Sequence, residues 1–215
     1  MKSVDYKNLS LKEFDKAAAK FDDNDPSVYN LCRKDYPDVF EEVSKEPFSD
    51  LLDAGCGTGA MLQLFHKDLP QANYTGIDLS EKMIEIAGRK QIENVRFVVG
   101  DCEALPFEDN SFDVVTCSMS FHHYPHPEKF FMNLQRVLRP NGRFILRDMA
   151  SKRKPVMWFI NNIELPLINR IFKKGDVHAY SRADIQRLCE LSGLVLESYE
   201  VRKFFRLHCV VRKTD

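Results

Sequence analysis

The chain has 215 residues, of which 44% are hydrophobic and 29% charged, and its 31 basic and 32 acidic side chains leave a formal net charge of −1. A chain of this length and composition buries enough apolar surface for one folded domain, which excludes intrinsic disorder and dependence on disulfides. It contains no run of 18 apolar residues and no N-terminal apolar stretch typical of a secretory signal. We therefore expect a cytoplasmic protein without a transmembrane segment.

Charge and cysteine placement give the first indications about partners. Residues 151–215 hold 13 basic and 7 acidic side chains, whereas residues 1–150 hold 18 basic and 25 acidic ones. This asymmetry fits an anionic substrate or surface near the C-terminal third, and it also fits ordinary solvated faces. The six cysteines are dispersed, with no CxxC pair and no Cys/His cluster at zinc spacing. We expect reduced thiols and no metal site.

The N-terminal segment is predicted to be helical. Ser10 and Glu13 have the spacing of a capping box, and apolar residues recur at helical spacing as far as Phe21. The acidic, turn-rich stretch 22–26 breaks this helix. A second helical region is predicted to run toward Val43.

From residue 50 onward, short apolar runs alternate with helical periodicity. Because parallel strands need a crossover between them, this alternation predicts a doubly wound, mostly parallel α/β sheet. Ser80 is a typical N-cap for one crossover helix, and Pro140-Asn141-Gly142 is predicted to close another. The predicted strands are residues 50–54, 74–77, 95–99, 112–117 and 143–147.

The last third of the chain departs from this alternation. Residues 155–172 are aromatic and apolar, but Pro166 interrupts them and basic residues flank them. Ser181 is predicted to cap a further helix that ends at Gly193. The two β-rich runs within residues 194–211 are too close for a helical crossover, so we expect an antiparallel hairpin at a sheet edge. It would give seven strands with the last one antiparallel.

The sharpest motif, Asp53-Ala-Gly55-Cys56-Gly57-Thr-Gly59, follows the first predicted strand. Glycine permits positive φ and close approach of a ligand, and open α/β sheets bind nucleotides at such strand ends. Asp78 ends the second strand, where a carboxylate can accept hydrogen bonds from two ribose hydroxyls. Both features suit a nicotinamide dinucleotide as well as an adenosyl cofactor. The acid at Asp53, Asp101 after the third strand and the closing hairpin favour the adenosyl cofactor.

These motifs together resemble those of class I S-adenosylmethionine-dependent methyltransferases, in the small-molecule group that includes the ubiquinone and menaquinone biosynthesis methyltransferases. The resemblance implies a Rossmann-like methyltransferase fold, S-adenosyl-L-methionine as cofactor, and transfer of a methyl group to a small organic acceptor by in-line displacement. It is carried by LLDAGCGTG (51–59), YTGIDLS (74–80), VVGDCEALPFEDNSFDVV (98–115), LRPNGRFIL (138–146) and, more weakly, YSRADIQRLCELSGL (180–194).

The resemblance also implies a division of the chain. The N-terminal cap is expected to cover the cofactor with aromatic residues, Tyr29 first among them and Phe21 and Tyr36 beside it. The expected parts are an N-terminal helical cap (1–47), the S-adenosylmethionine-binding core (48–148), a substrate lid insertion (149–180), and a C-terminal helix and β-hairpin that complete the core sheet (181–215).

Cofactor contacts follow from the same resemblance. Gly55, Cys56 and Gly57 would line the methionine portion of the cofactor, with Asp53 near its amino group. Asp78 would hold the ribose hydroxyls.

At the adenine end, the resemblance implies that Leu79 packs against the ring and that Asp101 faces its amino group. Cys102 would supply a backbone contact. Ser118, just past the fourth strand, would close the floor of the cofactor site.

Catalysis places few demands on the protein, because the sulfonium already makes the methyl group a strong electrophile and positioning is the main contribution. A general base helps with an alcohol or a carbon acid and is dispensable for a phenol, carboxylate or thiolate. His122, after the fourth strand, is the first candidate for such a base, followed by His123, His178 and His126. His126 can instead cap the helix that begins at Pro127.

Partners and alternative functions stay open at this point. The apolar residues of 149–180 line an acceptor site or dock on the sheet or on a second subunit, which fits a monomer or a homodimer, and their flanking lysines also admit peripheral membrane contact. No nucleic-acid partner is expected, because the net charge is near zero and no aromatic/basic stacking array is visible. The alternatives are a catalytically silent S-adenosylmethionine-binding module and, more remotely, a nicotinamide-dependent oxidoreductase.

Overall fold

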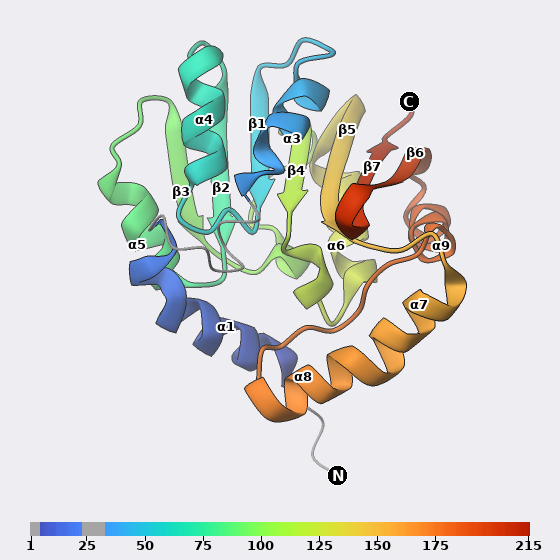
Figure 1. Ribbon diagram of the computed structural model, residues 1–215. Helices are drawn as coiled ribbons and strands as arrows, with labels where there is room; N and C mark the ends of the chain where they lie inside the picture. The colour runs from blue at the N-terminus through green and yellow to red at the C-terminus, as the bar shows by residue number, and fades with distance from the viewer. Residues whose placement is uncertain (1–4, 23–32) are drawn as a thin grey trace.

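The computed structural model describes residues 5–22 and 33–215, and its centre is a seven-stranded sheet with strand order β3-β2-β1-β4-β5-β7-β6 (Figure 1). The pairs from β3 to β5 are parallel, and β7 runs antiparallel to both β5 and β6. The predicted α/β class and the antiparallel last strand are confirmed. The strands are β1 (Asp50–Ala54), β2 (Asn73–Asp78), β3 (Val95–Val99), β4 (Phe112–Ser118), β5 (Leu138–Met149), β6 (Val195–Arg202) and β7 (Arg206–Arg212).

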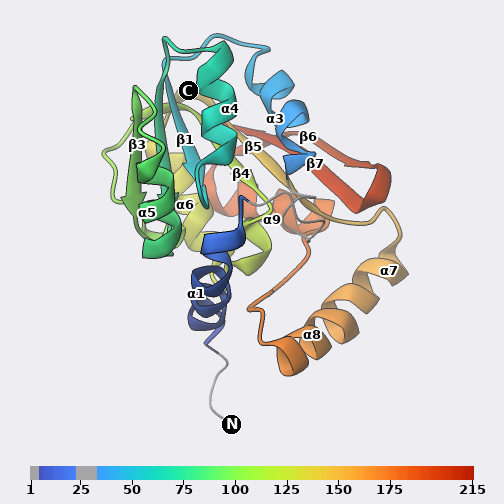
Figure 2. The ribbon, with the colours of Figure 1, turned by 60° about the vertical axis from the view of Figure 1, so that its left-hand side comes forward.

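Helices cover both faces of the sheet (Figures 1 and 2). Because successive residues of a strand point to opposite sides, Leu51 and Leu52 of β1 belong to two different apolar layers. One layer includes residues of α3 and α4, and the other includes residues of α6 and α9. The helices are α1 (Tyr6–Ala17), α3 (Tyr36–Val43), α4 (Ala60–Asp68), α5 (Glu81–Arg89), α6 (Pro127–Val137), α7 (Lys154–Phe159), α8 (Leu165–Phe172) and α9 (Arg182–Ser192).

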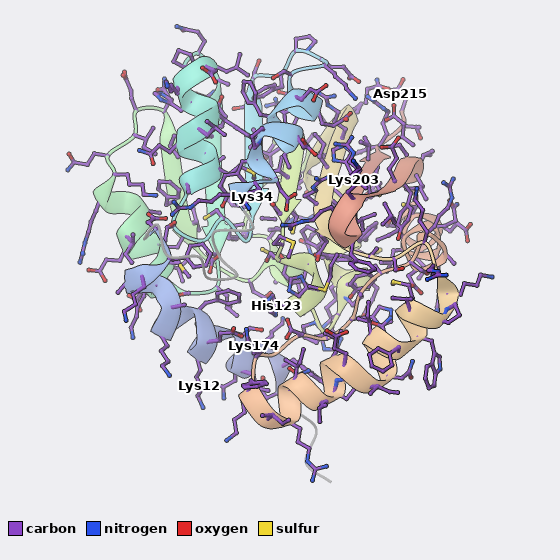
Figure 3. The ribbon with its side chains drawn as sticks, viewed as in Figure 1. Lys12, Lys34, His123, Lys174, Lys203 and Asp215 are labelled. Atoms are coloured by element: carbon purple, nitrogen blue, oxygen red, sulfur yellow. The ribbon has the colours of Figure 1, made fainter. Side chains whose placement is uncertain are left out.

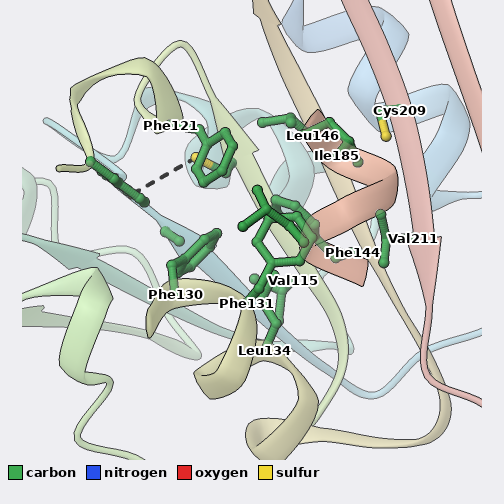
Figure 4. Packing of buried hydrophobic residues seen from close by; sticks show 14 of the residues in the cluster. Val115, Phe121, Phe130, Phe131, Leu134, Phe144, Leu146, Ile185, Cys209 and Val211 are labelled. Atoms are coloured by element: carbon green, nitrogen blue, oxygen red, sulfur yellow. Dashed lines mark hydrogen bonds between the residues drawn. The ribbon is translucent and has the colours of Figure 1, made fainter. Parts of the chain in front are cut away.

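The layer under α6 and α9 contains a group of aromatic rings (Figure 4). Phe130 of α6 meets Phe144 of β5 edge-on, with ring centroids 5.5 Å apart at 81°. Phe121, directly after β4, packs against Tyr180 with centroids 4.3 Å apart. The loop after β4, which carries two of the candidate histidines, is therefore anchored in the core.

The strand order reverses between β1 and β4, since the chain runs from β1 outward to β2 and β3 and then returns to β4 on the other side. The turns after these four strands meet at one edge of the sheet, the lower edge in Figure 1. Open α/β sheets bind their ligands at this kind of reversal.

The N-terminal helix begins earlier than predicted. Its N-cap is Asp5, whose side chain accepts the amide of Asn8. Ser10 lies inside the helix and is buried, with its hydroxyl donating to the carbonyl of Gly175 at 3.3 Å. The predicted cap at Ser10 is therefore wrong, because Asp5 already satisfies the first turn and a distant segment covers Ser10. The helical chain ends after a short turn, η1 (Ala18–Lys20); of the predicted break, residues 23–26 lie outside the described residues.

The turn predicted at Pro140-Asn141-Gly142 is an irregularity inside a longer strand. Pairing between β4 and β5 jumps from Leu138 to Arg143, and Asn141 adopts a φ of +64°. Here β5 begins directly at the end of α6, so the strand is longer than the predicted 143–147.

Residues 154–172, here called the arm, form one helical segment. Pro166 does not end it, because the backbone widens to a π-helix over η4 (Ile160–Glu164) before the proline, which lacks an N–H. Figure 2 shows the arm standing apart from the sheet. Within the described ranges, no helix is both long and apolar enough to cross a bilayer.

The C-terminal elements match the prediction. Ser181 caps α9 in a capping box with Asp184, and Gly193 ends the helix with a φ of +75°. β6 and β7 form the antiparallel hairpin, with β6 at the sheet edge. The five cysteines in the described part of the chain are free and buried.

Candidate active site

A cavity lies where the strand order reverses, and it encloses about 860 Å³ with its open mouth included. The turns after β1 to β4 form its floor, and α1 and the residue after η1 form its cover. The residues that line it from the sheet side include Gly55, Cys56, Gly57, Asp78, Leu79, Asp101, Cys102 and Ser118.

The turn after β1 accepts only glycine at its first position. Gly55 has a φ of +78°, and a Cβ there would lie 2.1 Å from Oγ of Ser120. The amides of Gly55 and Cys56 donate to the carbonyl of Ile77 at 2.8 and 3.0 Å, which folds the turn against the end of β2. The backbone therefore reaches the cavity without side-chain bulk at Gly55.

Asp78, the last residue of β2, faces the same cavity. One carboxylate oxygen accepts the amide of Gly57 at 2.8 Å, and the other accepts the amide of Ser80 at 2.9 Å. Burial raises the pKa of Asp78, while these amides oppose the rise by stabilising the carboxylate. Since a carboxylate has about four acceptor sites, each oxygen can still accept a hydrogen bond from a ligand.

The α1 helix closes the cavity from the opposite side. Lys7 donates a hydrogen bond to the carboxylate of Asp101 and forms an ion pair with the carboxylate of Glu103. Burial opposes the charge on Lys7, but the two carboxylates outweigh it and raise the pKa of Lys7. Oγ of Ser80 donates to Oδ1 of Asp15 at 2.6 Å, which ties the second half of α1 to the start of α5. Side chains therefore hold both halves of the cover.

Comparison with known proteins identifies the family. A model described as "Methyltransferase domain" matches residues 52–146. Demethylmenaquinone methyltransferase of Thermotoga maritima is 31% identical over 180 residues, which cover 81% of this chain and 78% of that protein. The chain belongs to the class I S-adenosylmethionine-dependent methyltransferases.

Two further proteins extend the comparison. Phthiotriol/phenolphthiotriol dimycocerosates methyltransferase of Mycobacterium tuberculosis is 36% identical over 118 residues, 54% of this chain and 44% of its own length. Geranyl diphosphate C-methyltransferase from Streptomyces coelicolor, solved with Mg²⁺, geranyl diphosphate and S-adenosyl-L-homocysteine, shares the fold alone, with a TM-score of 0.73 at 15% identity over 99% of this chain and 100% of that chain. This methyltransferase is accordingly an enzyme that transfers a methyl group.

Of the nine residues that the resemblance assigns to the cofactor, Asp53 is the one that does not line the cavity of this methyltransferase. It is paired in register with Thr116 of β4, and its 2%-exposed side chain accepts the Thr116 hydroxyl at 3.0 Å. Burial raises the pKa of Asp53 to about 7. Its position one residue inside the end of β1 directs the side chain toward β4 rather than into the cavity.

The four candidate bases of the methyltransferase do not converge on the cavity. His123 lines the cavity, whereas His122, His126 and His178 do not. His126 occupies the N-cap position of α6, as its structural interpretation expects, but its side chain makes no capping hydrogen bond. Nε2 of His178 lies 3.6 Å from Asp184 at the start of α9.

His122 is buried beside the cavity, not in it. Its Nδ1–H donates to Asp148 at 2.8 Å, and its backbone amide donates to the other oxygen of Asp148 at 3.1 Å. Burial favours the neutral ring, but Asp148 and Asp176 outweigh it and raise the pKa of His122 to about 10. Burial and the neighbouring charge of His122 lower the pKa of His123 to about 3. His122 does not line the cavity, and its two ring nitrogens face Asp148 and Asp176.

The sequence predicts an N-terminal cap over the cofactor, but it does not identify the α1 residues that line the cavity. These residues follow a helical i, i+3, i+4, i+7 spacing, which is the signal that could have found them, but the face mixes charged, polar and apolar side chains. Of the expected aromatic cover, Phe21 and Tyr36 line the cavity, and Tyr29 lies outside the described residues. The α1 lining residues are Lys7, Ser10, Leu11 and Phe14.

Proposed function

We propose that this chain binds S-adenosylmethionine in the cavity, with the adenosine over the turns after β2 and β3 and the methionine portion along the turn after β1. One observation supports this above all others. Asp78 keeps acceptor capacity on both oxygens directly beside the glycine turn. A ribose diol offers two donors to such a carboxylate, and Gly55 leaves room for the amino-acid tail.

The remaining contacts are proposed in the same frame. Leu79 packs against the adenine ring. Asp101 accepts a hydrogen bond from the adenine amino group while keeping its hydrogen bond from Lys7. Cys102 contributes a backbone contact. Ser118 forms the floor. Its hydroxyl is buried and has no hydrogen-bond partner among the residues the structure describes, so a bound ligand can supply one.

Asp53 is proposed to act on the cofactor indirectly. Its hydrogen bond with Thr116 joins β1 to β4 just behind the glycine turn.

The bound cofactor supplies an electrophilic methyl group, and the chain orients it for in-line attack. Leu11 and Phe14 of α1, which line the cavity, exclude water from that attack.

The acceptor is proposed to be a small molecule with an apolar body. The cavity offers it aromatic and thioether side chains, and two relatives are named as methyltransferases of demethylmenaquinone and of phthiotriol/phenolphthiotriol dimycocerosates. The apolar lining residues include Leu11, Phe14, Phe21, Met83 and Met119.

Residues 149–180 are proposed to serve as the substrate lid, with the arm as a peripheral membrane contact. Apolar side chains four residues apart stay exposed along the arm, and Trp158 and Phe172 are 61% and 67% exposed. Residues 152–174 hold six basic side chains and one acidic one. A basic amphipathic helix with exposed aromatic rings binds anionic lipid surfaces. The exposed stripe is Phe159, Ile163, Leu167 and Ile171.

Ligand-dependent stability tests the cofactor assignment. S-adenosylhomocysteine at 100 times its Kd should raise the free energy of unfolding by about 2.7 kcal/mol, and NAD should leave it unchanged. Stabilisation by NAD alone would support the oxidoreductase alternative. Binding of S-adenosylhomocysteine without turnover of any apolar phenol, hydroquinone or alcohol would support the silent module.

Vesicle cosedimentation tests the arm. The wild-type chain should sediment with vesicles that contain anionic phosphatidylglycerol and remain in solution with pure phosphatidylcholine. Trp158→Ser combined with Phe172→Ser should remove this binding. Leu191→Ser is the matched control, because Leu191 is 60% exposed but lies on α9. Equal binding by all variants would rule out the arm as the contact.

A further inference from the structure

We propose that His122, His123 and Asp176 form a binding site for a divalent transition-metal ion such as Zn²⁺, at the edge of the cofactor cavity. The two histidines close η3 (Phe121–His123) after β4, and Asp176 follows the arm. One ligand atom from each of the three lies within 4.8 Å of the other two. All three residues are buried, and Figure 3 shows His123 below the strand ends, above Lys174 in that view.

The separations to Asp176 suit a metal better than hydrogen bonds, although Nδ1 of His123 also lies 3.3 Å from Oγ of Ser10 and must exchange that contact for the metal. Nε2 of His122 lies 3.4 Å and Nδ1 of His123 lies 3.7 Å from Oδ1 of Asp176. Hydrogen bonds between such atoms span about 2.7–3.2 Å. Ligand atoms about 2.0–2.1 Å from a tetrahedral Zn²⁺ stand about 3.3–3.4 Å from one another. Two of the three distances between ligand atoms therefore need little adjustment to fit a zinc ion.

Neighbouring groups hold the ligands in orientation. Because Nδ1–H of His122 donates to Asp148, the other ring nitrogen turns toward Asp176. A carboxylate behind a ligating imidazole is the usual support for bound zinc. The amide of Val177 donates to the carbonyl of His122 at 2.7 Å, which fixes the segment of Asp176 against η3.

Charge favours a cation at this point. The side chains of Asp148 and Asp176 are 2% and 12% exposed, and two neutral imidazoles between two carboxylates leave a formal charge of −2. Nearby, Lys174 adds positive charge toward Asp176, although its ammonium also lies 3.3 Å from Glu13. Without a metal, the cluster must take up a proton to reduce its charge. A divalent ion replaces that proton and offsets both carboxylates.

The position of the site suggests its use, which rests on the proposed function. Three protein ligands leave a coordination position open, and His123 and Ser10 both line the cavity. An acceptor hydroxyl bound there would lose its proton to water more readily. A lone pair of the acceptor oxygen would then form a C–O bond with the methyl group. The C–S bond would break at the same time, and the electron pair of that bond would stay on sulfur. The substrate class implied is an alcohol or phenol.

Metal titration of the chelator-stripped protein tests the site. We expect one Zn²⁺ per chain, and with Co²⁺ the visible absorption of a four- or five-coordinate ion. Asp176→Asn and His123→Gln should each weaken Zn²⁺ binding at least tenfold and remove the Co²⁺ band. Asp148→Asn, which keeps all three ligands, should weaken binding about 10- to 100-fold. His66→Gln on α4 is the control and should change nothing.

Circular dichroism tests whether each variant is folded. If Asp176→Asn does not fold, His123→Gln is compared with the wild type instead. Absence of stoichiometric Zn²⁺ binding by the wild type, or equal binding by the wild type and the ligand variants, overturns the site. S-adenosylhomocysteine is titrated into the same samples. Failure of that ligand alone counts against the proposed function, and failure of Zn²⁺ alone counts against the metal site.

Discussion

The two walls of the cavity are built in different ways. In the sheet wall, short turns at the strand ends carry the residues. Asp78 accepts hydrogen bonds from the amides of Ser80, two positions on, and of Gly57, 21 positions before it. In the α1 wall, Lys7 meets Asp101 across 94 positions and Ser10 meets Gly175 across 165. The first wall forms with the sheet, and the second depends on side chains that meet only after the sheet has folded. We infer that the sheet wall determines whether the cofactor binds and that α1 determines how fast it exchanges.

The largest expected effect is at the sheet wall. Gly55→Ala should weaken S-adenosylhomocysteine binding at least 100-fold and lower the free energy of unfolding by about 2–4 kcal/mol, because the new Cβ meets Ser120 at a strained backbone position. Gly88→Ala is the control, since a Cβ there meets nothing within 4 Å in α5. It should stabilise the protein by up to about 1 kcal/mol. Calorimetry measures the affinity for S-adenosylhomocysteine, and urea unfolding measures the free energy of unfolding. Equal values for the two variants would contradict the role of Gly55 in the sheet wall.

A smaller effect is expected at the α1 wall. Lys7→Met should increase the rate of S-adenosylhomocysteine dissociation about tenfold, because Asp101 and the buried Glu103 lose the cation that holds α1 over the cavity. Stopped-flow displacement measures this rate. Lys12→Met, which removes an exposed cation from the same helix, should leave the rate unchanged. An unchanged rate in Lys7→Met as well would mean that α1 does not control exchange.

The smallest effect belongs to another locally built feature, the capping box of α9. The nearby His178 imidazole, together with the hydrogen bonds that Ser181 donates, lowers the pKa of Asp184 to about 2. A lowered pKa stabilises the folded state above the ordinary pKa of about 4, and that stability disappears as the pH falls from about 4 to about 2. The free energy of unfolding of the wild type should therefore exceed that of Asp184→Asn by about 0.5–1 kcal/mol at pH 6 and by less at pH 3. The difference is small because the Asp184 side chain is partly exposed. Urea unfolding at both pH values checks this; a difference independent of pH would contradict the assignment.

The same contrast explains what the sequence could predict. The strands and the N-caps at Ser80 and Ser181 follow from residue types and spacing over a few positions, and the structure contains them. The sheet order and the positions of Gly55 and Asp78 at the cavity follow from the alternation of strands and helices.

What the sequence could not predict depends on distant contacts. Ser10 has cap spacing but is a buried partner of Gly175, and Asp53 lies next to the glycine turn but faces Thr116. The adjacent histidines meet Asp176 only because the segment after the arm folds back against η3. No spacing rule connects residues that far apart.

The most direct measurement of the central claim is the affinity of S-adenosylhomocysteine for wild type, Asp78→Ala and Asp68→Ala, by isothermal titration calorimetry. Two hydrogen bonds to a charged group contribute together about 3 kcal/mol or more, so Asp78→Ala should bind at least about 100-fold more weakly. Asp68→Ala changes an exposed acid at the end of α4 and should bind as the wild type does. Equal affinities for all three proteins would contradict the account.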